Sequence, residues 1–127
     1  MSSKLLSHKD RVDALISQMW KSGYLTISRK YGKYLPSPKP IGDFEVDVIA
    51  RYKKNYMMGI VVNEKELKNP KFLAKIIYLS SRNVKYSKEK VKLLIGINIQ
   101  YYNELKNLID TLPSENKEQI QIYPINN

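Results

Sequence analysis

Two carboxylates at alternate positions of an apolar segment are the residues most suited to chemistry. Glu45 and Asp47 lie in the segment Phe-Glu-Val-Asp-Val-Ile-Ala at residues 44–50. Side chains two positions apart share one face of a strand, so we expect both carboxylates on one face and the flanking apolar residues on the other. Such a carboxylate carries a desolvation penalty unless a partner compensates its charge. A bound Mg²⁺ or Mn²⁺ would do so, because hard cations take carboxylate oxygens; the alternative partner is a lysine.

A second polar group follows the next apolar segment, where Asn63, Glu64, Lys65 and Glu66 come directly after two valines. If the strand continues, Asn63 and Lys65 share one face, while Glu64 and Glu66 share the other. A carboxylate opposite a carboxylate-x-lysine on the partner strand is the arrangement of a metal-dependent nuclease. The carboxylates hold the cation, the cation activates water, and the lysine positions that water.

The positive charge of the chain points to polyanions. Lysine and arginine number 22 against 12 acidic residues, which gives a net charge of +10. Such an excess favours binding of nucleic acid through phosphate neutralisation. Basic and aromatic residues alternate just before the Asp47 segment, where lysines and arginine could contact phosphates and tyrosines could stack on bases. The predicted nucleic-acid-binding residues are Arg29, Lys30, Tyr31, Lys33, Tyr34 and Lys39. The alternative is a solvated loop on a lysine-rich surface.

Composition excludes several other classes of protein. The chain has 127 residues, which suits a single domain over 1–127, and 43% of them are hydrophobic. The absence of cysteine excludes disulfides, cysteine-ligated metals and thiol catalysis. The one histidine, His8, has no partner motif, and we interpret it as a surface residue. No apolar run approaches the roughly 20 residues of a membrane span, and no secretory signal is evident, so we expect a cytoplasmic protein.

The spacing of apolar residues predicts the elements that position these groups. We expect helices at 9–22, 70–81 and 101–112, and a loop at 29–43. Strands are expected at 24–28, 44–51, 56–63, 91–97 and 119–123, and the pair 44–51 and 56–63 should form an antiparallel hairpin. The order αβββαβαβ predicts an α/β fold with a central mixed β-sheet flanked by helices, two of which, 9–22 and 70–81, should cover the sheet.

This order of elements resembles the PD-(D/E)XK superfamily, and within it the archaeal Holliday junction resolvases. The resemblance covers roughly residues 8–98 and rests on the leading helix, Lys-Ser-Gly-Tyr at 21–24, the basic loop and Val-Asp-Val-Ile-Ala at 46–50. It implies a restriction-endonuclease-like α/β sandwich in which Asp47 is the first aspartate of the motif. The resolvases also carry an acid early in the first helix, which Asp13 or Asp10 could match, with Asp13 preferred for its distance from Gly23.

The second half of the motif departs from the pattern. The superfamily expects Glu-x-Lys or Asp-x-Lys, and this chain offers Asn63-Glu64-Lys65 if residues are inserted in the turn. Without an insertion, Ile60 and Val62 fill the two positions. A bulge would instead turn Glu64 and Glu66 toward the metal. The predicted catalytic residues are Asp47, Asn63 and Lys65, and the predicted metal ligands are Asp47, Glu45, Glu64 and Asp13.

Two functions follow from the resemblance. The first is a Mg²⁺- or Mn²⁺-dependent, structure-selective DNA endonuclease that acts as a homodimer, because symmetric cutting of two strands needs two sites. The second is a catalytically inactive nuclease-fold protein that binds DNA or a partner protein, with no cofactor. A third hypothesis, a protein-interaction subunit whose charge is incidental, would show no salt-dependent DNA binding.

Overall fold

The protein folds around one five-stranded β-sheet, in a computed structural model that describes residues 6–83 and 89–126. The strands are β1 (Leu25–Arg29), β2 (Val48–Tyr52), β3 (Asn55–Val62), β4 (Lys92–Asn98) and β5 (Ile120–Ile125). The helices are α1 (His8–Lys21), α2 (Glu64–Leu67), α3 (Phe72–Ser80), η1 (Ile99–Tyr101), α4 (Tyr102–Ile109) and α5 (Ser114–Lys117).

The sheet is mixed, and its strands lie in chain order from β1 to β5. The first three strands pair antiparallel, with Val48 opposite Gly59 and Tyr52 opposite Asn55 across a tight turn. Strands β3, β4 and β5 pair parallel, because α2 and α3 carry the chain from β3 to β4, and α4 and α5 carry it from β4 to β5. The predicted antiparallel hairpin and the predicted mixed sheet are therefore confirmed.

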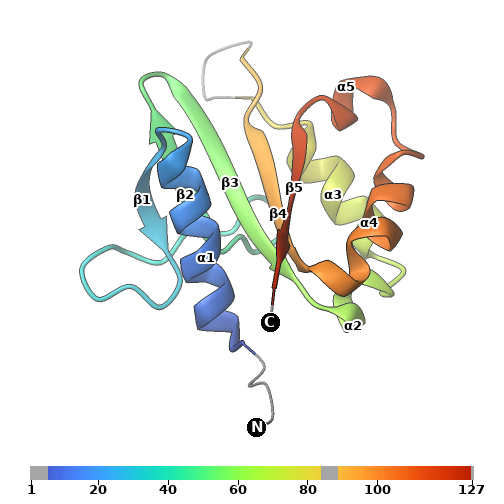
Figure 1. The fold of residues 1–127 in the computed structure, drawn as a ribbon. Helices are drawn as coiled ribbons and strands as arrows, with labels where there is room; N and C mark the ends of the chain where they lie inside the picture. The colour runs from blue at the N-terminus through green and yellow to red at the C-terminus, as the bar shows by residue number, and fades with distance from the viewer. Residues whose placement is uncertain (1–5, 84–88, 127) are drawn as a thin grey trace, which may run out of the picture.

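Helix α1 covers one face of this sheet (Figure 1). Its buried residues Val12, Leu15 and Met19 recur at helical spacing and pack on the strands. Two strand glycines permit this close approach. A Cβ at Gly59 would lie 2.8 Å from the ends of Leu15 and Met19, and a Cβ at Gly96 would lie 2.7 Å from Leu15. The sequence of the sheet thus fixes where α1 lies.

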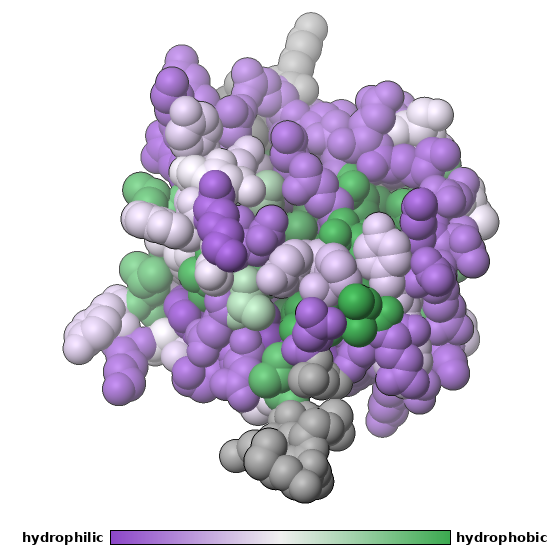
Figure 2. Space-filling model, viewed as in Figure 1, coloured by the Kyte–Doolittle hydropathy of each residue, from purple (hydrophilic) through white to green (hydrophobic). Residues whose placement is uncertain are grey.

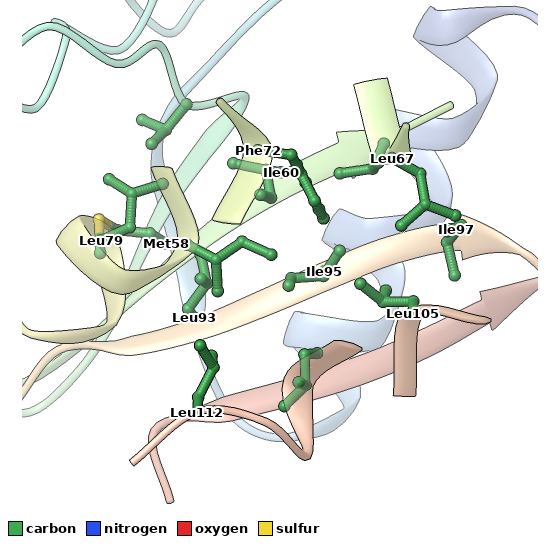
Figure 3. Close-up of a cluster of buried hydrophobic side chains, with 14 of the residues drawn as sticks. Met58, Ile60, Leu67, Phe72, Leu79, Leu93, Ile95, Ile97, Leu105 and Leu112 are labelled. Carbon is green, nitrogen blue, oxygen red and sulfur yellow. The ribbon is translucent and has the colours of Figure 1, made fainter. Parts of the chain in front are cut away.

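The other face of the sheet carries the larger core. Helices α3 and α4 lie on this side in Figure 1, and Figure 3 shows side chains from β3 and β4 meeting those of the helices. Ile60 and Ile95 from the strands and Leu79 and Leu105 from the helices are almost wholly buried. Each such side chain contributes roughly 1.5–3 kcal/mol on burial, so the two packed faces stabilise the sheet together. The predicted cover by helices 9–22 and 70–81 is confirmed.

One predicted strand is wrong in its first half. The strand expected at 44–51 begins only at Val48, because Phe44 closes a tight turn with Ile41 through two backbone hydrogen bonds. The chain then bends at Asp47, so the alternation of faces breaks down. Val46 packs in the core with α3, whereas Val48 packs under α1. The expectation that the flanking apolar residues all share one face is therefore also wrong.

The strand predicted at 56–63 corresponds to β3, which ends at Val62 and does not continue through residue 66. Residues 64–67 form the one-turn helix α2, so the strand alternation does not extend to Glu64 and Glu66.

The face seen in Figure 2, which is the side of α1, is mostly hydrophilic with small apolar patches. In the described part of the chain, no helix has the length and apolar character needed to span a membrane.

Candidate functional site

Asp47 is the buried carboxylate of the molecule's candidate site, and it lies at the start of β2. It is the one charged residue among the buried residues of the described chain, with 5% of the residue exposed. The chain bends here, yet the backbone still pairs on both sides, since Lys30 N–H donates to Asp47 and Asp47 N–H donates to Gly59. These bonds hold the Asp47 carboxylate against the end of β3.

Three donors surround this carboxylate. Its Oδ2 accepts a hydrogen bond of 2.7 Å from the backbone N–H of Val61. Its Oδ1 lies 3.5 Å from Nζ of Lys30 and 3.4 Å from Nε2 of His8. A buried charge with these partners has its desolvation cost offset within the protein. Lys30 is therefore the lysine partner that the sequence left open for Asp47.

Lys30 joins this buried carboxylate to the surface. Its ammonium group also lies 3.5 Å from Oε2 of Glu45, whose side chain is 75% exposed. Burial alone would lower the pKa of Lys30, but attraction by Asp47 and Glu45 outweighs burial and raises that pKa above its ordinary value. Glu45 and Asp47 therefore do share a partner, and that partner is a lysine.

His8 connects Asp47 to the basic loop, although no sequence pattern pointed to it. It is the first residue of α1, and Ser7 fixes the helix start as the N-cap of a capping box. The His8 ring lies between two groups, with Nε2 on Asp47 and Nδ1 2.5 Å from the hydroxyl of Tyr31. Asp47 lies 39 positions and Tyr31 lies 23 positions after His8 in the chain. Only the packing of α1 across the sheet brings them together.

Asp13, the predicted metal ligand on the first helix, is held by cations. Its carboxylate oxygens lie 2.5 Å from the guanidinium of Arg29 and 3.1 Å from Nζ of Lys9. Burial by itself would raise the pKa of Asp13, but the hydrogen bonds from Arg29 and Lys9 outweigh it and lower that pKa. Asp13 thus anchors the start of the basic loop to α1.

Residues 63–66 do not form the second half of a metal motif. The side chain of Asn63 is the N-cap of α2 and accepts a hydrogen bond of 2.8 Å from Glu66 N–H. Glu64 lies 3.6 Å from Lys68, and a hydrogen bond from Tyr101 is the main cause that lowers the pKa of Glu64. Lys65 is exposed on the helix surface. Residues 64–67 thus follow helical rather than strand geometry, while Asn63 and Glu66 line a hollow together with His8.

The residues of β3 beside Asp47 also differ from Ile60 and Val62, the two that the sequence predicts without an insertion. Ile60 and Val62 face the large core with α3. Val61 faces the α1 side and donates its N–H to Asp47, and Asn63 follows two residues later. The register therefore puts an apolar side chain and an amide where the motif needs a carboxylate and a lysine.

The donor set does not fit a resident Mg²⁺ ion. Hard cations need several oxygen ligands that converge on one point. Within residues 6–83 and 89–126, no three histidine or acidic side chains come together in such a group. Of the predicted ligands, Glu45 and Asp47 share Lys30, Asp13 pairs with Arg29, and Glu64 pairs with Lys68.

Two open hollows flank the His8 ring and Tyr31. One, of about 360 Å³, has Tyr31 with Lys9, Arg29 and Lys33 in its lining. The other, of about 210 Å³, has His8 with Arg11, Asn63 and Glu66 in its lining. The loop itself is exposed, and Tyr34 at its tip has 96% of its surface open to solvent.

Comparison of the chain with protein-family models, curated proteins and solved structures finds no match.

Proposed function

We propose that this protein binds nucleic acid, with double-stranded DNA as the first substrate class to test, and that it does so without a metal ion at Asp47. We further propose that its mixed sheet is a restriction-endonuclease-like α/β sandwich of the PD-(D/E)XK superfamily. The strand order and the place of Asp47 at the start of β2 support this assignment. The basic loop at residues 29–39 is the proposed contact surface.

The observation that carries the binding function is the grouping of cations around the hollow beside Tyr31. Lys9, Arg29 and Lys33 line that hollow from α1 and from the loop. Lys33 and Lys39 are exposed, and Lys33 has no carboxylate partner among the described residues. An unpaired lysine is free to displace counterions from phosphates, which is the main source of non-specific affinity for DNA.

The charge balance at Asp47 favours binding over Mg²⁺-dependent cutting. Lys30 already neutralises the carboxylate that would have to hold the cation. A second carboxylate would be needed beside it, and that position is occupied by Val61. The side chains therefore support the form of the prediction that lacks metal-dependent cutting.

Charge reversal on the loop tests this function. We expect Lys33→Glu with Lys39→Glu to weaken binding of a short DNA duplex and to flatten the salt dependence of Kd. Each lost phosphate contact removes about 0.9 from the slope of log affinity against log salt. Fluorescence anisotropy of a labelled duplex over a series of salt concentrations measures both quantities.

The matched control is Lys54→Glu with Lys106→Glu, which changes the net charge equally. Lys54 lies in the turn between β2 and β3, and Lys106 lies on α4, and both side chains are exposed. The control should retain the slope of the native protein. Equal weakening by both double variants would contradict the assignment of the loop, as would binding that requires Mg²⁺ and disappears in EDTA.

A further inference from the structure

Tyr31, His8 and Asp47 form a continuous chain of polar contacts that the binding function does not use. The hydroxyl of Tyr31 lies 2.5 Å from Nδ1 of His8, and Nε2 of His8 lies 3.4 Å from Oδ1 of Asp47. Oδ1 of Asp47 is an acceptor and faces Nε2, which favours the tautomer with the imidazole hydrogen on Nε2. In that tautomer Nδ1 accepts the hydrogen of the Tyr31 hydroxyl.

This order of groups is that of an activated nucleophile. A hydroxyl bonded to a base, with the base oriented by a carboxylate, is the general arrangement of nucleophilic catalysis. Tyr31 is 49% exposed, so its hydroxyl can be reached from solvent. Asp47, in contrast, is buried and acts only through His8, which makes it a positioning residue.

The backbone at Tyr31 is held in an unusual conformation. Its φ of 64° lies in the left-handed region, which is uncommon for a residue other than glycine. Residues held in such strained conformations cluster at functional sites. Backbone hydrogen bonds on either side, from Arg29 to Pro36 and from Lys30 to Asp47, fix the loop at this point. The loop thus presents the Tyr31 side chain to His8.

The surroundings of Tyr31 suit a phosphodiester as the electrophile. The hollow of about 360 Å³ next to it is lined by Lys9, Arg29 and Lys33. Cations at that position would stabilise the negative charge that develops on phosphate oxygens during attack. A carbonyl substrate would need backbone or amide donors instead, whereas the charged side chains in this lining are all cationic.

We infer that Tyr31 is a nucleophile that attacks a backbone phosphate of bound nucleic acid and forms a phosphotyrosyl bond without a metal ion. The step rests on the proposed binding function. The hydroxyl proton passes to Nδ1 of His8, the phenolic oxygen forms the new P–O bond, and the P–O bond to one ribose oxygen breaks. The imidazolium then returns the proton to that ribose oxygen. One phosphodiester replaces another, so the exchange needs no oxidant or reductant.

The test is a denaturing gel with the full chain and labelled DNA in EDTA. Nicked duplexes and a four-way junction serve as probes, because a nick beside the cleaved phosphate lets the leaving strand diffuse away and traps the adduct. The native protein should give a labelled band that resists denaturant and is destroyed by protease. Mass spectrometry of the residual peptide should place the nucleotide on Tyr31.

Matched variants distinguish a nucleophile from a structural residue. Tyr31→Phe removes one hydroxyl and should abolish the adduct, while Tyr52→Phe, at the exposed far end of β2, should form it at the native rate. His8→Gln should lower the rate of adduct formation roughly 100-fold, as expected for loss of a general base. Anisotropy measures the Kd of each variant separately, and the rates of adduct formation are compared at saturating DNA.

The positioning role of Asp47 has its own readout. The His8 ring faces Tyr31, Asp47 and a hollow lined by Arg11 and Glu66. Asp47→Asn removes the carboxylate that faces Nε2, so it should lower the rate of adduct formation at saturating DNA, and Asp47→Glu, which restores a carboxylate, should recover part of that rate. A merely structural effect would lower the rate equally in both variants.

Three results would overturn the inference. DNA binding by the native protein without any adduct on these probes rejects the nucleophile and leaves the binding function intact. An adduct that persists in Tyr31→Phe assigns the bond to another residue and rejects Tyr31. Absence of both binding and adduct rejects the proposed function as well.

Discussion

At the residue scale, Lys30 takes the place that a metal ion would have beside Asp47. Its ammonium group lies 3.5 Å from oxygens of both Asp47 and Glu45, and those charges raise its pKa above the ordinary value of 10.5. A raised pKa in the folded state means that folding favours the protonated lysine. Its contribution to stability is complete below about pH 10.5 and is lost as the pH rises through the folded value.

We therefore expect Lys30→Gln to destabilise the protein at neutral pH and to do so less at high pH. The difference in free energy of unfolding between the native protein and the variant should stay constant up to about pH 10.5 and shrink as the pH rises further, since Lys30 in the folded protein loses its proton only above its ordinary pKa. Urea titrations followed by circular dichroism measure it. Lys33→Gln is the control, because Lys33 lines the loop hollow with no carboxylate partner among the described residues. A difference for Lys30→Gln that stays constant with pH would show that its charge does not stabilise the fold.

The residues of the site were only partly predictable from the sequence. Asp47 was recognisable, because an acid in an apolar segment must be compensated. His8 was not, because its contacts with Tyr31 and Asp47 depend on how α1 crosses the sheet. Asn63 was misinterpreted for a local reason: its side chain caps α2, and a strand that ends in a cap looks, in sequence, like a strand that continues.

At the scale of elements, the packing of α1 on the sheet sets the geometry of the site, since α1 carries His8 and Asp13. That packing depends on the lack of a side chain at Gly96, where a Cβ would lie 2.7 Å from Leu15 and 3.0 Å from Ile125. The helix at 9–22 was predictable because its apolar residues recur at a period that only a helix satisfies. The start of β2 was not, because the turn closed by Ile41 and Phe44 leaves residues 44–47 looking like a strand.

We expect Gly96→Ala to lower the free energy of unfolding by about 1–3 kcal/mol, the usual cost of overpacking a core. Leu15→Ala alone should cost about 2–5 kcal/mol through the cavity it leaves. In the double variant the new methyl group occupies part of that cavity, so the combined loss should be smaller than the sum. Urea unfolding of the four proteins completes this cycle. Strictly additive losses would show that Leu15 and Gly96 are not in contact.

At the scale of the whole molecule, charge and fold converge on one end of the sheet. The chain carries a net charge of +10. The start of α1, the basic loop and Asp47 meet where β1 ends and β2 begins, at the lower end of the view in Figure 1. The opposite face carries α3 and α4 over the larger core. We therefore propose that nucleic acid binds on the α1 side of the sheet, at the end where β1 ends and β2 begins.

The most direct test of this claim is a titration of the isotope-labelled protein with a short DNA duplex, in EDTA, followed by amide chemical shifts. A chain of 127 residues suits this measurement. The account predicts shift changes concentrated in residues 8–13 and 29–47, with α3 and α4 little affected. Changes concentrated on α3 and α4, or no changes at DNA concentrations well above those of the protein, would contradict it.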